Sequence, residues 1–440
     1  MALAEPCEPA WHPFESGGEI GVSDTVPDLT VWNGDLIVAG AFTTAGGRTV
    51  NHIARWDGKA WHPLTSGGEI GVNGGWVRAV TVWNGDLIAA GSFTSAGGRT
   101  VNRIARWDGK AWHPLASGGE IGVTGGVVRA VTVWDGDLIV GGTFTMAGGQ
   151  TANQIVRWDG SMWHPFTSGG EIGLGDLCCA PMVLDLTVWK GDLIVAGKFP
   201  SAGGQTVNHI ARWDGEAWHP FTTSGGQTGV SIHVVGVAAL TLWNGDLIAG
   251  GDFHAAGGQT VNYIARWDGS KWHPFTSGGQ IGVASNWGVW ALTVWNGDLV
   301  AGGDVFSAGG QFVNRIARWD GEAWHPFSSG GQVGVAGPSF TSETFALTEW
   351  DDDLIAGGPF TTAGGQTVNR IARWAWPTPG GPADLNCDGI VDVFDLLILL
   401  GEWGECADPE ACPADLTGPE GEPDGVVNVH DLLKLISSWG

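Results

Sequence analysis

The chain has 440 residues, a formal net charge of −26 at pH 7 and only 15% charged residues. An acidic surface repels phosphate backbones and anionic headgroups, so nucleic acid and anionic membranes are excluded as expected partners. No apolar run reaches the roughly 18 residues that a membrane-spanning helix needs, so no membrane span is expected.

A unit of about 50 residues, the length of a solenoid or propeller repeat, occurs seven times. Three tryptophan motifs recur in a fixed order in these repeats. The motif W-x-G-D-L starts at Trp32, Trp83, Trp134, Trp189, Trp243 and Trp295, with the variant W-D-D-D-L at Trp350. The motif R-W ends at Trp56, Trp107, Trp158, Trp213, Trp267, Trp319 and Trp374. The motif W-H-P starts at Trp11, Trp61, Trp112, Trp163, Trp218, Trp272 and Trp324.

Residues 79–115 predict four antiparallel strands in each repeat. The apolar runs 79–83 and 86–90 flank Asn84-Gly85, a strong signal for a tight hairpin. A longer connection leads to a third strand at 104–107, and Asp108-Gly109 turns the chain into a fourth strand at 111–115. Four strands in a unit of this length predict one propeller blade per repeat.

The two ends of the repeat array predict how it closes. The last repeat ends at Trp374 without a fourth strand, whereas residues 10–14 form a fourth strand without the other three. We therefore expect an all-β, seven-bladed propeller over residues 1–376, closed by the N-terminal strand, which removes exposed sheet edges.

The order of an apolar strand, D-L-I-x-G-G, a loop and R-W-D-G resembles kelch repeats over roughly residues 10–376. The matching marks include Gly250-Gly251 and Gly302-Gly303 at the end of the second strand. The resemblance implies a binding scaffold, with copper oxidases as an exception that uses a Tyr–Cys cofactor. The chain departs from that exception, because its single tyrosine, Tyr263, has no cysteine in the nearby strands.

The spacing of the motifs predicts which face of the propeller binds. From W-x-G-D-L to R-W the distance is 24 residues in all seven repeats, whereas from W-H-P to the next W-x-G-D-L it runs from 21 to 26. Variable loops on a rigid scaffold usually carry the binding site. The segments that differ most are 23–27, 176–182, 227–235, 284–290 and 336–343.

Eight residues outside the repeat pattern are candidates for ligand binding: Trp76, Arg78, Arg129, Trp287, Trp290, Asp252, His254 and Asp304. The three tryptophans either stack on a sugar ring or cap a blade. The two arginines occupy the same repeat position, and either reach the central channel or pair with a nearby carboxylate. The two aspartates, with His254, form a possible acid pair for hydrolysis.

The composition changes after Trp376. Residues 377–382 form a Pro/Gly linker, and residues 383–440 form a separate domain. Its first loop places oxygen ligands at positions 1, 3, 5, 9 and 12 of a calcium loop, with glycine at position 6. The predicted ligands are Asp384, Asn386, Asp388, Asp392 and Asp395, with the carbonyl group of Ile390 at position 7.

A second, interrupted copy of this loop follows. Its predicted ligands are Asp415, Thr417, Asp424, Asn428 and Asp431, with the carbonyl group of Val426. Helices are expected at 396–403 and 432–439. Two such loop–helix units resemble a type I dockerin, which implies one or two bound Ca²⁺ ions and a cohesin-like or cell-surface partner. The partner-reading positions of that family fall on Val393-Phe394 and Val429-His430.

The six cysteines predict an oxidising environment. Their spacing makes Cys406–Cys412 a plausible disulfide, Cys7–Cys387 a possible one, and leaves Cys178-Cys179 either bonded or reduced. Disulfides and calcium indicate a secreted or cell-surface protein, although residues 1–5 do not resemble a signal peptide.

Three functional hypotheses follow from the sequence. The first is a secreted, non-catalytic protein whose propeller binds a polysaccharide or a protein and whose tail anchors it. The second is a propeller hydrolase or lyase that acts on a polysaccharide. The third is a structural protein of the cell surface. Whether the protein is an enzyme stays open, with binding favoured.

Overall fold

The computed structural model describes residues 9–175, 181–337, 342–375, 383–385, 391–401, 403–406, 412, 414–417, 423 and 425–439. The chain divides into two compact units. The larger, which we call the repeat unit, comprises residues Pro13–Ser328 and Gln332–Arg373. The smaller, the tail unit, comprises Met1–His12, Ser329–Gly331 and Trp374–Gly440.

The second repeat shows how each sheet is built. Its strands β13 (Val77–Trp83), β14 (Asp86–Gly91), β17 (Ile104–Trp107) and β18 (Trp112–Pro114) are hydrogen-bonded in chain order. Asn84 and Gly85 connect β13 to β14 with φ angles of 52° and 85°, the positive values that a type I′ turn requires. The four strands predicted for residues 79–115 are therefore confirmed.

The remaining sheets have the same architecture. Their strands are, in repeat order, β4 (Asp28–Trp32), β5 (Asp35–Ala39), β8 (Ile53–Trp56) and β9 (Trp61–Pro63); β22 (Val128–Trp134), β23 (Asp137–Gly142), β26 (Ile155–Trp158) and β27 (Trp163–Pro165); β31 (Met182–Trp189), β32 (Asp192–Lys198), β35 (Ile210–Trp213) and β36 (Trp218–Pro220); β37 (Val230–Trp243), β38 (Asp246–Ala256), β40 (Ile264–Trp267) and β41 (Trp272–Pro274); β44 (Val283–Trp295), β45 (Asp298–Ala308), β47 (Ile316–Trp319) and β48 (Trp324–Pro326); and β52 (Ala346–Trp350), β53 (Asp353–Gly357) and β56 (Ile371–Ala375) with β1 (Ala10–Pro13).

The connections contain short hairpins that the sequence did not predict. In the second repeat, the connection from β14 to β17 forms β15 (Ser95–Ala96) and β16 (Arg99–Thr100), and β12 (Val72–Asn73) pairs with β15. The connection from β9 to β13 forms β10 (Thr65–Ser66) and β11 (Glu69–Ile70). Strands of two residues are too short to show the apolar alternation that identifies a strand in a sequence.

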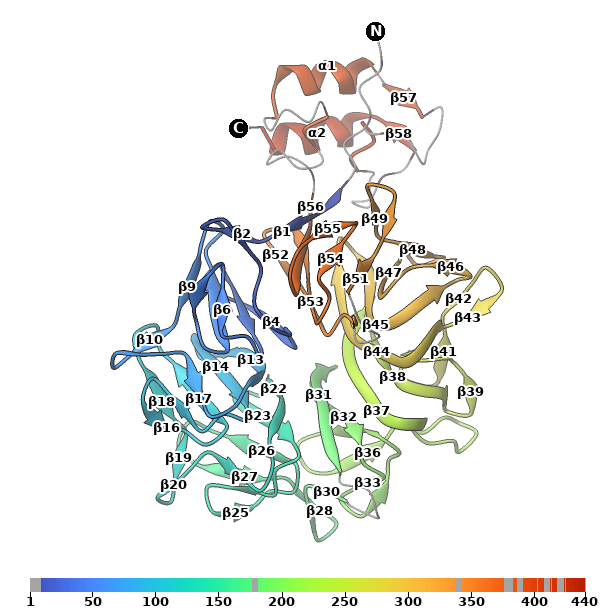
Figure 1. The fold of residues 1–440 in the computed structure, drawn as a ribbon. Coiled ribbons are helices and arrows are strands. Elements are labelled where there is room, and N and C mark those ends of the chain that lie inside the picture. The colour runs from blue at the N-terminus through green and yellow to red at the C-terminus, as the bar shows by residue number, and fades with distance from the viewer. Residues whose placement is uncertain are drawn as a thin grey trace. The chain divides into compact units, whose positions relative to one another are not determined.

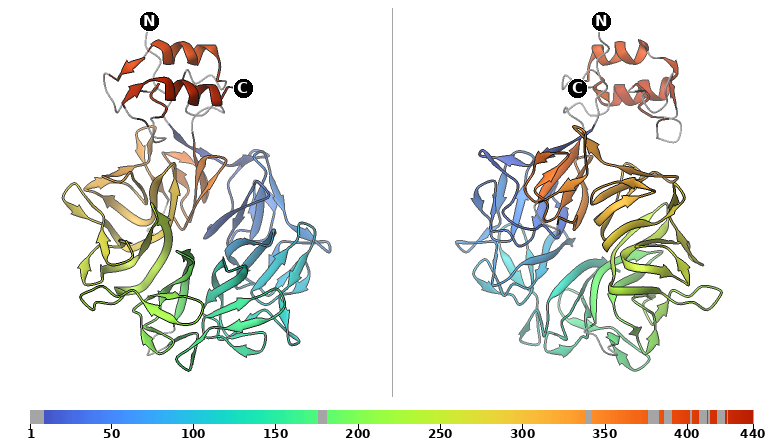
Figure 2. Two further views of the ribbon diagram at one scale, coloured as in Figure 1. Left: turned by 180° about the vertical axis from the view of Figure 1, so that it is seen from behind. Right: turned by 45° about the vertical axis from the view of Figure 1, so that its right-hand side comes forward.

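The sheets of the repeat unit follow one another around a common centre, with the first strand of each repeat innermost (Figures 1 and 2). The tryptophan of each first strand donates an indole N–H to a carbonyl group in the first turn of the next repeat. The distances are 2.8–3.0 Å for Trp32–Gly85, Trp83–Gly136, Trp134–Gly191, Trp189–Gly245, Trp243–Gly297, Trp295–Asp352 and Trp350–Gly34. The seventh of these bonds joins the last repeat to the first.

A second set of hydrogen bonds joins the same neighbours on the opposite face. Asn51 has a φ angle of 50° and donates its side-chain N–H to the carbonyl group of Ile70, 3.2 Å away. The equivalent bonds are Asn102–Ile121, Asn153–Ile172, Asn208–Thr228, Asn262–Ile281, Asn314–Val333 and Asn369–Ile20. Each pair of neighbouring repeats is thus fastened at both faces.

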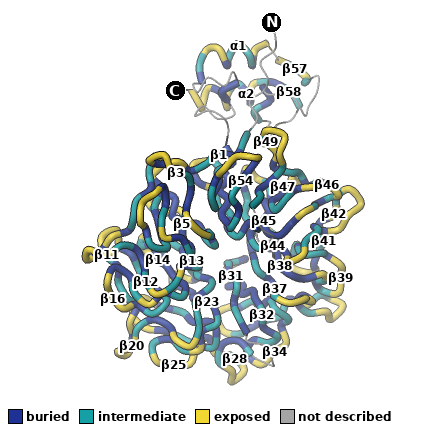
Figure 3. Tube along the Cα trace, in the orientation of Figure 1, coloured by how far each residue is buried: buried dark blue, intermediate teal, exposed yellow. Residues whose placement is uncertain are grey.

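The core lies between neighbouring repeats rather than within one sheet. One cluster joins Ile37 and Ile53 of the first repeat to Val77, Trp107 and Trp112 of the second. Buried residues follow the strands and exposed ones follow the turns (Figure 3). The tryptophan of each W-H-P motif is fully buried, as expected for aromatic residues that dominate the packing.

The described part of the tail unit contains two helices, α1 (Val393–Gly401) and α2 (Val429–Ser437), and the pair β57 (Gly404–Glu405) and β58 (Val426–Val427). Both helices begin three residues before the predicted positions. The reason is capping: Asp392 and Asn428 accept the N–H groups of Phe394 and His430, each at 2.8 Å. Neither helix is long enough to cross a membrane.

The predicted disulfide Cys406–Cys412 is confirmed. Cys7, Cys178, Cys179 and Cys387 lie outside the described residues, as does the predicted linker 377–382. The other cysteine pairings therefore stay predictions.

Candidate functional site

The face that carries the first–second and third–fourth turns, here the uniform face, repeats one set of polar contacts. Asp108 accepts the N–H groups of Lys110 and Ala111 at 2.8 Å, and its other oxygen lies 2.8 Å from Nε2 of His113. Five other repeats have the same histidine–aspartate pair. The W-H-P histidines in these six repeats are thus engaged by their own turns.

The arginine of R-W pairs with the aspartate of W-x-G-D-L. Arg106 Nη1 lies 2.5 Å from Asp86 Oδ2, and the other six repeats have the same ion pair. This arginine therefore has a structural role in each repeat. Because the arginine pairs recur in seven repeats and the histidine pairs in six, the uniform face offers little that distinguishes one ligand from another.

The opposite face, here the variable face, carries the second–third and fourth–first connections. Near this face, the first strand of five repeats contains a one-residue β-bulge. In β13, Val77 pairs with Gly91 and Ala79 with Ala90, so Arg78 has no partner across the ladder. The residues at this repeat position form what we call the inner rim: Pro27, Arg78, Arg129, Leu184, Ala238, Trp290 and Phe345.

Side chains of the inner rim meet their neighbours from the next repeat. The rings of Trp290 and Phe345 lie 6.3 Å apart, edge to face. Arg78 and Arg129 occupy the same position of the neighbouring first strands β13 and β22. Burial lowers the pKa of Arg129, and the charge of Arg78 lowers it further. The inner rim therefore has a cationic side in repeats two and three, and an aromatic side in repeats six and seven.

The two arginines have no ion pair within the described residues, although carboxylate pairing was one of the two roles predicted for them. That interpretation is wrong for the part of the chain that the structure describes. Burial lowers the pKa of both groups, and no acidic residue offsets this effect. Arg78 instead lies over the ring of Trp76, with Cζ 5.2 Å from the centroid, a distance suited to a cation–π contact.

Two of the three candidate tryptophans are exposed on the variable face. Trp76 and Trp287 are 47% and 52% exposed. Both backbones are held in place, because the N–H of Trp76 binds Ser92 Oγ at 2.9 Å and that of Trp287 binds Ser285 Oγ at 3.2 Å. Trp290 is partly buried against Phe345. The exposed pair suits ligand stacking, whereas Trp290 packs within the inner rim.

The two candidate aspartates are 2% exposed and engaged by the protein itself. Asp252 accepts the N–H groups of Val234 and Val235 at 2.8 and 3.2 Å. Asp304 lies 3.2 Å from the guanidinium group of Arg315. The ring of His254 packs on Tyr263 at 4.7 Å. Nδ1 of the exposed His233 lies 4.0 Å from Asp252. Both carboxylates thus have partners within the protein, and the hydrolase stays a hypothesis.

Sequence reasoning missed two carboxylates near the centre of the repeat unit. Asp28 accepts the N–H of Val80 at 2.7 Å, and Asp185 accepts that of Leu240 at 2.6 Å, so each bridges to the next repeat. The other five repeats have alanine at this position, so the two aspartates depart from the repeat pattern, and this departure could have identified them. Burial raises the pKa of each group to about 7 against the effect of these N–H donors, and the charge of Asp185 raises the pKa of Asp28 further.

Stability should therefore fall as the pH rises through the range in which these groups ionise. A carboxyl group whose pKa is higher in the folded protein favours folding when protonated, and this contribution is lost between about pH 4 and pH 7. Over that interval, we expect the free energy of unfolding of the wild type to fall by at least about 1 kcal/mol more than that of the variant Asp28→Ala/Asp185→Ala. Urea unfolding of both proteins at pH 4 and pH 7.5 measures this difference. A difference that is constant with pH would contradict the prediction.

Two cavities of similar construction lie between neighbouring repeats on the variable face. One, of about 440 Å³, is lined by Asn153, Gln154 and Glu171, and another, of about 380 Å³, by Asn208, His209 and Gln227. The residue after the bridging asparagine lines both. It is the most variable position of V-N-x-I-A-R-W, and its φ angle is 70–78° in all repeats: His52, Arg103, Gln154, His209, Tyr263, Arg315 and Arg370.

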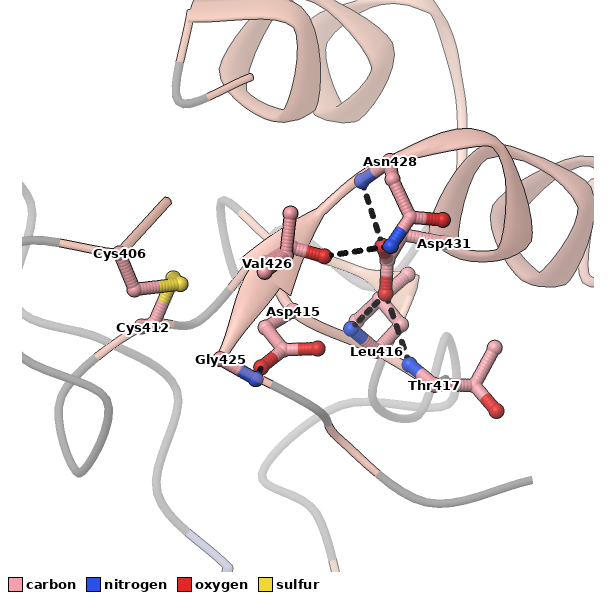
Figure 4. The surroundings of a disulfide bond; sticks show 9 residues. All are labelled: Cys406, Cys412, Asp415, Leu416, Thr417, Gly425, Val426, Asn428 and Asp431. Carbon is pink, nitrogen blue, oxygen red and sulfur yellow. Dashed lines mark hydrogen bonds between the residues drawn. A yellow bond between two sulfur atoms is a disulfide. The ribbon is translucent and has the colours of Figure 1, made fainter. Parts of the chain in front are cut away.

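In the tail unit, the described loop residues place buried carboxylates beside backbone N–H groups (Figure 4). Asp415 accepts the N–H of Gly425 at 2.6 Å, which closes the second loop between its positions 1 and 6. Asp431 accepts the N–H groups of Leu416 and Thr417 at 2.5 and 2.7 Å. Asp384, Asp395 and Asp431 are fully buried and Asp415 nearly so.

Several predicted calcium ligands cannot be placed. Asn386, Asp388, Ile390 and Asp424 lie outside the described residues, and the described ones alone do not gather three acidic, histidine or cysteine side chains around one point. Calcium therefore stays a prediction. The composition favours binding of a cation, because residues 383–440 contain 13 acidic residues and one basic residue, Lys434.

Both tail helices expose apolar side chains at equivalent positions. In α1 these are Val393, Phe394, Leu397 and Leu400, each at least 50% exposed. Val429, Leu433 and Ile436 occupy the matching positions of α2 and are 51–59% exposed. Three of the four predicted partner-reading residues, Val393, Phe394 and Val429, thus belong to two apolar faces of the same construction.

Comparison with known proteins agrees with this architecture. Residues 135–158, from the first turn to the end of the third strand in one repeat, match a β-propeller domain of unknown function, DUF5122. The repeat unit is a β-propeller. No curated protein matches the chain.

Solved structures of low identity are also similar to the chain. The WD40 β-propeller domain of Doa1 is 13% identical, with a TM-score of 0.43 over 84% of this chain and 95% of that one. The computationally designed Ika8 protein is 15% identical, with a TM-score of 0.36 over 80% of this chain and 97% of that one.

Proposed function

We propose that the protein is a secreted binding protein whose propeller recognises a polysaccharide or a protein on its variable face, and whose tail anchors it through a calcium-dependent module. One observation carries the proposal: side chains that break the repeat pattern, including the exposed Trp76 and Trp287, lie on the variable face. A β-propeller suits a binding or scaffold role, because its loops vary while its strands hold them in place.

The propeller is proposed to have seven kelch-like blades in a closed ring. The seven indole hydrogen bonds support this count, since the last one runs from Trp350 to Gly34. The bond from Asn369 to Ile20 supports the same closure on the other face. The sheet order β1-β56-β53-β52 agrees with an N-terminal strand that completes the last blade.

The tail is proposed to bind one or two Ca²⁺ ions in dockerin-like loops. Asp384, Asn386, Asp388, Asp392 and Asp395 would hold the first ion, and Asp415, Thr417, Asp424, Asn428 and Asp431 the second. Carboxylate and carbonyl oxygens are the ligands that calcium prefers. The burial of Asp384, Asp395, Asp415 and Asp431 supports the proposal, because an ionised carboxylate that is buried is unfavourable unless it is paired or coordinates a metal.

The partner of the tail is proposed to be a cohesin-like or cell-surface protein that covers one of the two apolar helix faces. Phe394 and Leu397 in α1, at 59% and 60% exposed, are the central residues of the first face. Exposed apolar patches of this kind mark protein interaction sites. These faces are more apolar than the polar pairs typical of dockerins, so the partner surface should be apolar too.

A glycan array probed with the full-length protein tests the propeller's role. We expect one class of polysaccharide to be retained and left chemically intact, and the variant Trp76→Ala/Trp287→Ala to lose at least tenfold in affinity. The matched control is Trp403→Ala, which removes an indole of similar exposure from the tail. A cleaved or modified glycan would favour the hydrolase or lyase instead, and binding that survives in the double variant would place the ligand elsewhere.

A further inference from the structure

The inner rim of the second and third repeats concentrates positive charge in a protein of net charge −26. Seven of the 14 arginines are the R-W arginines, each neutralised by an aspartate on the strand beside it. Arg78 and Arg129 differ from these. They are partly buried, they occupy the same bulged position of the neighbouring strands β13 and β22, and no carboxylate pairs with them within the described residues.

The fold itself does not require these arginines. The same bulge is occupied by Leu184 in the fourth repeat and by Ala238 in the fifth. Two neighbouring cations that are partly removed from water are unfavourable unless a negative group offsets them. A ligand that brings an anionic group to this point would supply the missing partner.

The surroundings of Arg78 favour an anionic group carried on a sugar. Guanidinium groups bind carboxylates and sulfates through paired hydrogen bonds. Beside Arg78 lies the ring of Trp76, half of which is exposed. Indole rings are apolar surfaces with a polar edge, which suits contact with the face of a pyranose ring. An acidic peptide would use the arginines but not the adjacent aromatic surface.

We propose that Arg78 and Arg129 form a binding site for the anionic groups of an acidic polysaccharide, with Trp76 as the adjacent stacking surface. This inference rests on the proposed binding role of the variable face and names its substrate class. The anionic group is a carboxylate or a sulfate, since the two guanidinium groups can donate hydrogen bonds to either.

The test compares polymers that share one backbone: dextran, carboxymethyl-dextran and dextran sulfate, with polyglutamate as the peptide counterpart. Calorimetric titration of the full-length protein should show binding to at least one anionic dextran and at least tenfold weaker binding to dextran. The variant Arg78→Ala/Arg129→Ala should lose at least tenfold in affinity for that polymer. It should fold normally, because alanine occupies this position in the fifth repeat, and its circular dichroism spectrum checks this.

The matched control is Lys59→Ala/Lys110→Ala, which removes two exposed charges from the uniform face of the first and second repeats. Its net charge equals that of the arginine variant, so unchanged affinity in the control assigns the loss to the inner rim. Preference for carboxymethyl-dextran identifies the group as a carboxylate, and preference for dextran sulfate identifies it as a sulfate.

Four results would overturn the inference, three of them from the titrations. One is equal affinity of the arginine variant and the wild type, another is an equal loss in both variants, and the third is binding to polyglutamate alone. A neutral glycan that is retained on the array, together with no binding to any anionic polymer, would overturn the anion site and leave the proposed function in place.

Discussion

Replacing Trp112 by alanine should lower the free energy of unfolding by about 3–5 kcal/mol, the usual cost of deleting a large buried aromatic side chain. Trp112 is fully buried, and its ring lies 5.2 Å from that of Trp107. It belongs to a cluster that includes Ile37 and Ile53 of the preceding repeat, so the cavity would open between two sheets. Urea unfolding followed by far-ultraviolet circular dichroism measures the change.

Trp76→Ala is the control for Trp112→Ala. The side chain of Trp76 is 47% exposed, and surface substitutions usually change stability by less than about 0.5 kcal/mol. A loss below about 1 kcal/mol for Trp112→Ala would show that the sheets close over the space, contrary to the dense packing expected of protein interiors.

Removing calcium should unfold the tail and leave the propeller folded. Asp384, Asp395, Asp415 and Asp431 are buried, and metal binding supplies much of the folding free energy of small metal-binding modules. Limited proteolysis of the full-length protein, with calcium and with EGTA, should cleave residues 383–440 at least tenfold faster in EGTA. The propeller fragment should persist in both.

Two single substitutions separate the loops in this experiment. Asp395→Ala should remove the protection of the first loop, and Asp431→Ala that of the second, because these residues occupy position 12 of each loop. Asp57→Ala, on the uniform face of the propeller, is the matched control and should leave tail protection unchanged. Cleavage at one rate in calcium and EGTA would contradict the dockerin interpretation.

The repeated part of the fold could be predicted because each local signal agreed with the next. Asn84-Gly85 predicted a tight turn and the flanking apolar runs predicted two strands. The same signals recur in seven repeats, so a weak signal in one repeat did not change the prediction. The small hairpins β10–β11 and β15–β16 escaped prediction, because two-residue strands show no alternation. The helix starts were also missed, because the side chains of Asp392 and Asn428 cap the helices earlier than the apolar spacing indicates.

The candidate site could be predicted only as a set of departures from the repeat. Arg78, Trp76 and Trp287 were found in this way. Asp28 and Asp185 were not, although alanine at the same position of five repeats marked them. What the sequence could not supply was the pairing: it left either a carboxylate partner or an open site for Arg78, and among the described residues no carboxylate pairs with it.

The hydrogen bonds between repeats imply an order of assembly. At six junctions the indole donor and its acceptor are separated by 53–57 residues, whereas Trp350 and Gly34 are separated by 316. Loop-closure entropy grows only logarithmically with length, so the last junction costs about 1.5 kcal/mol more than the others. Six junctions can form as soon as each next repeat has been synthesised, whereas the seventh must wait for the last repeat. The Trp350–Gly34 bond is chemically like the other six, but it orders the longest segment of chain, so we expect it to form last and to break first.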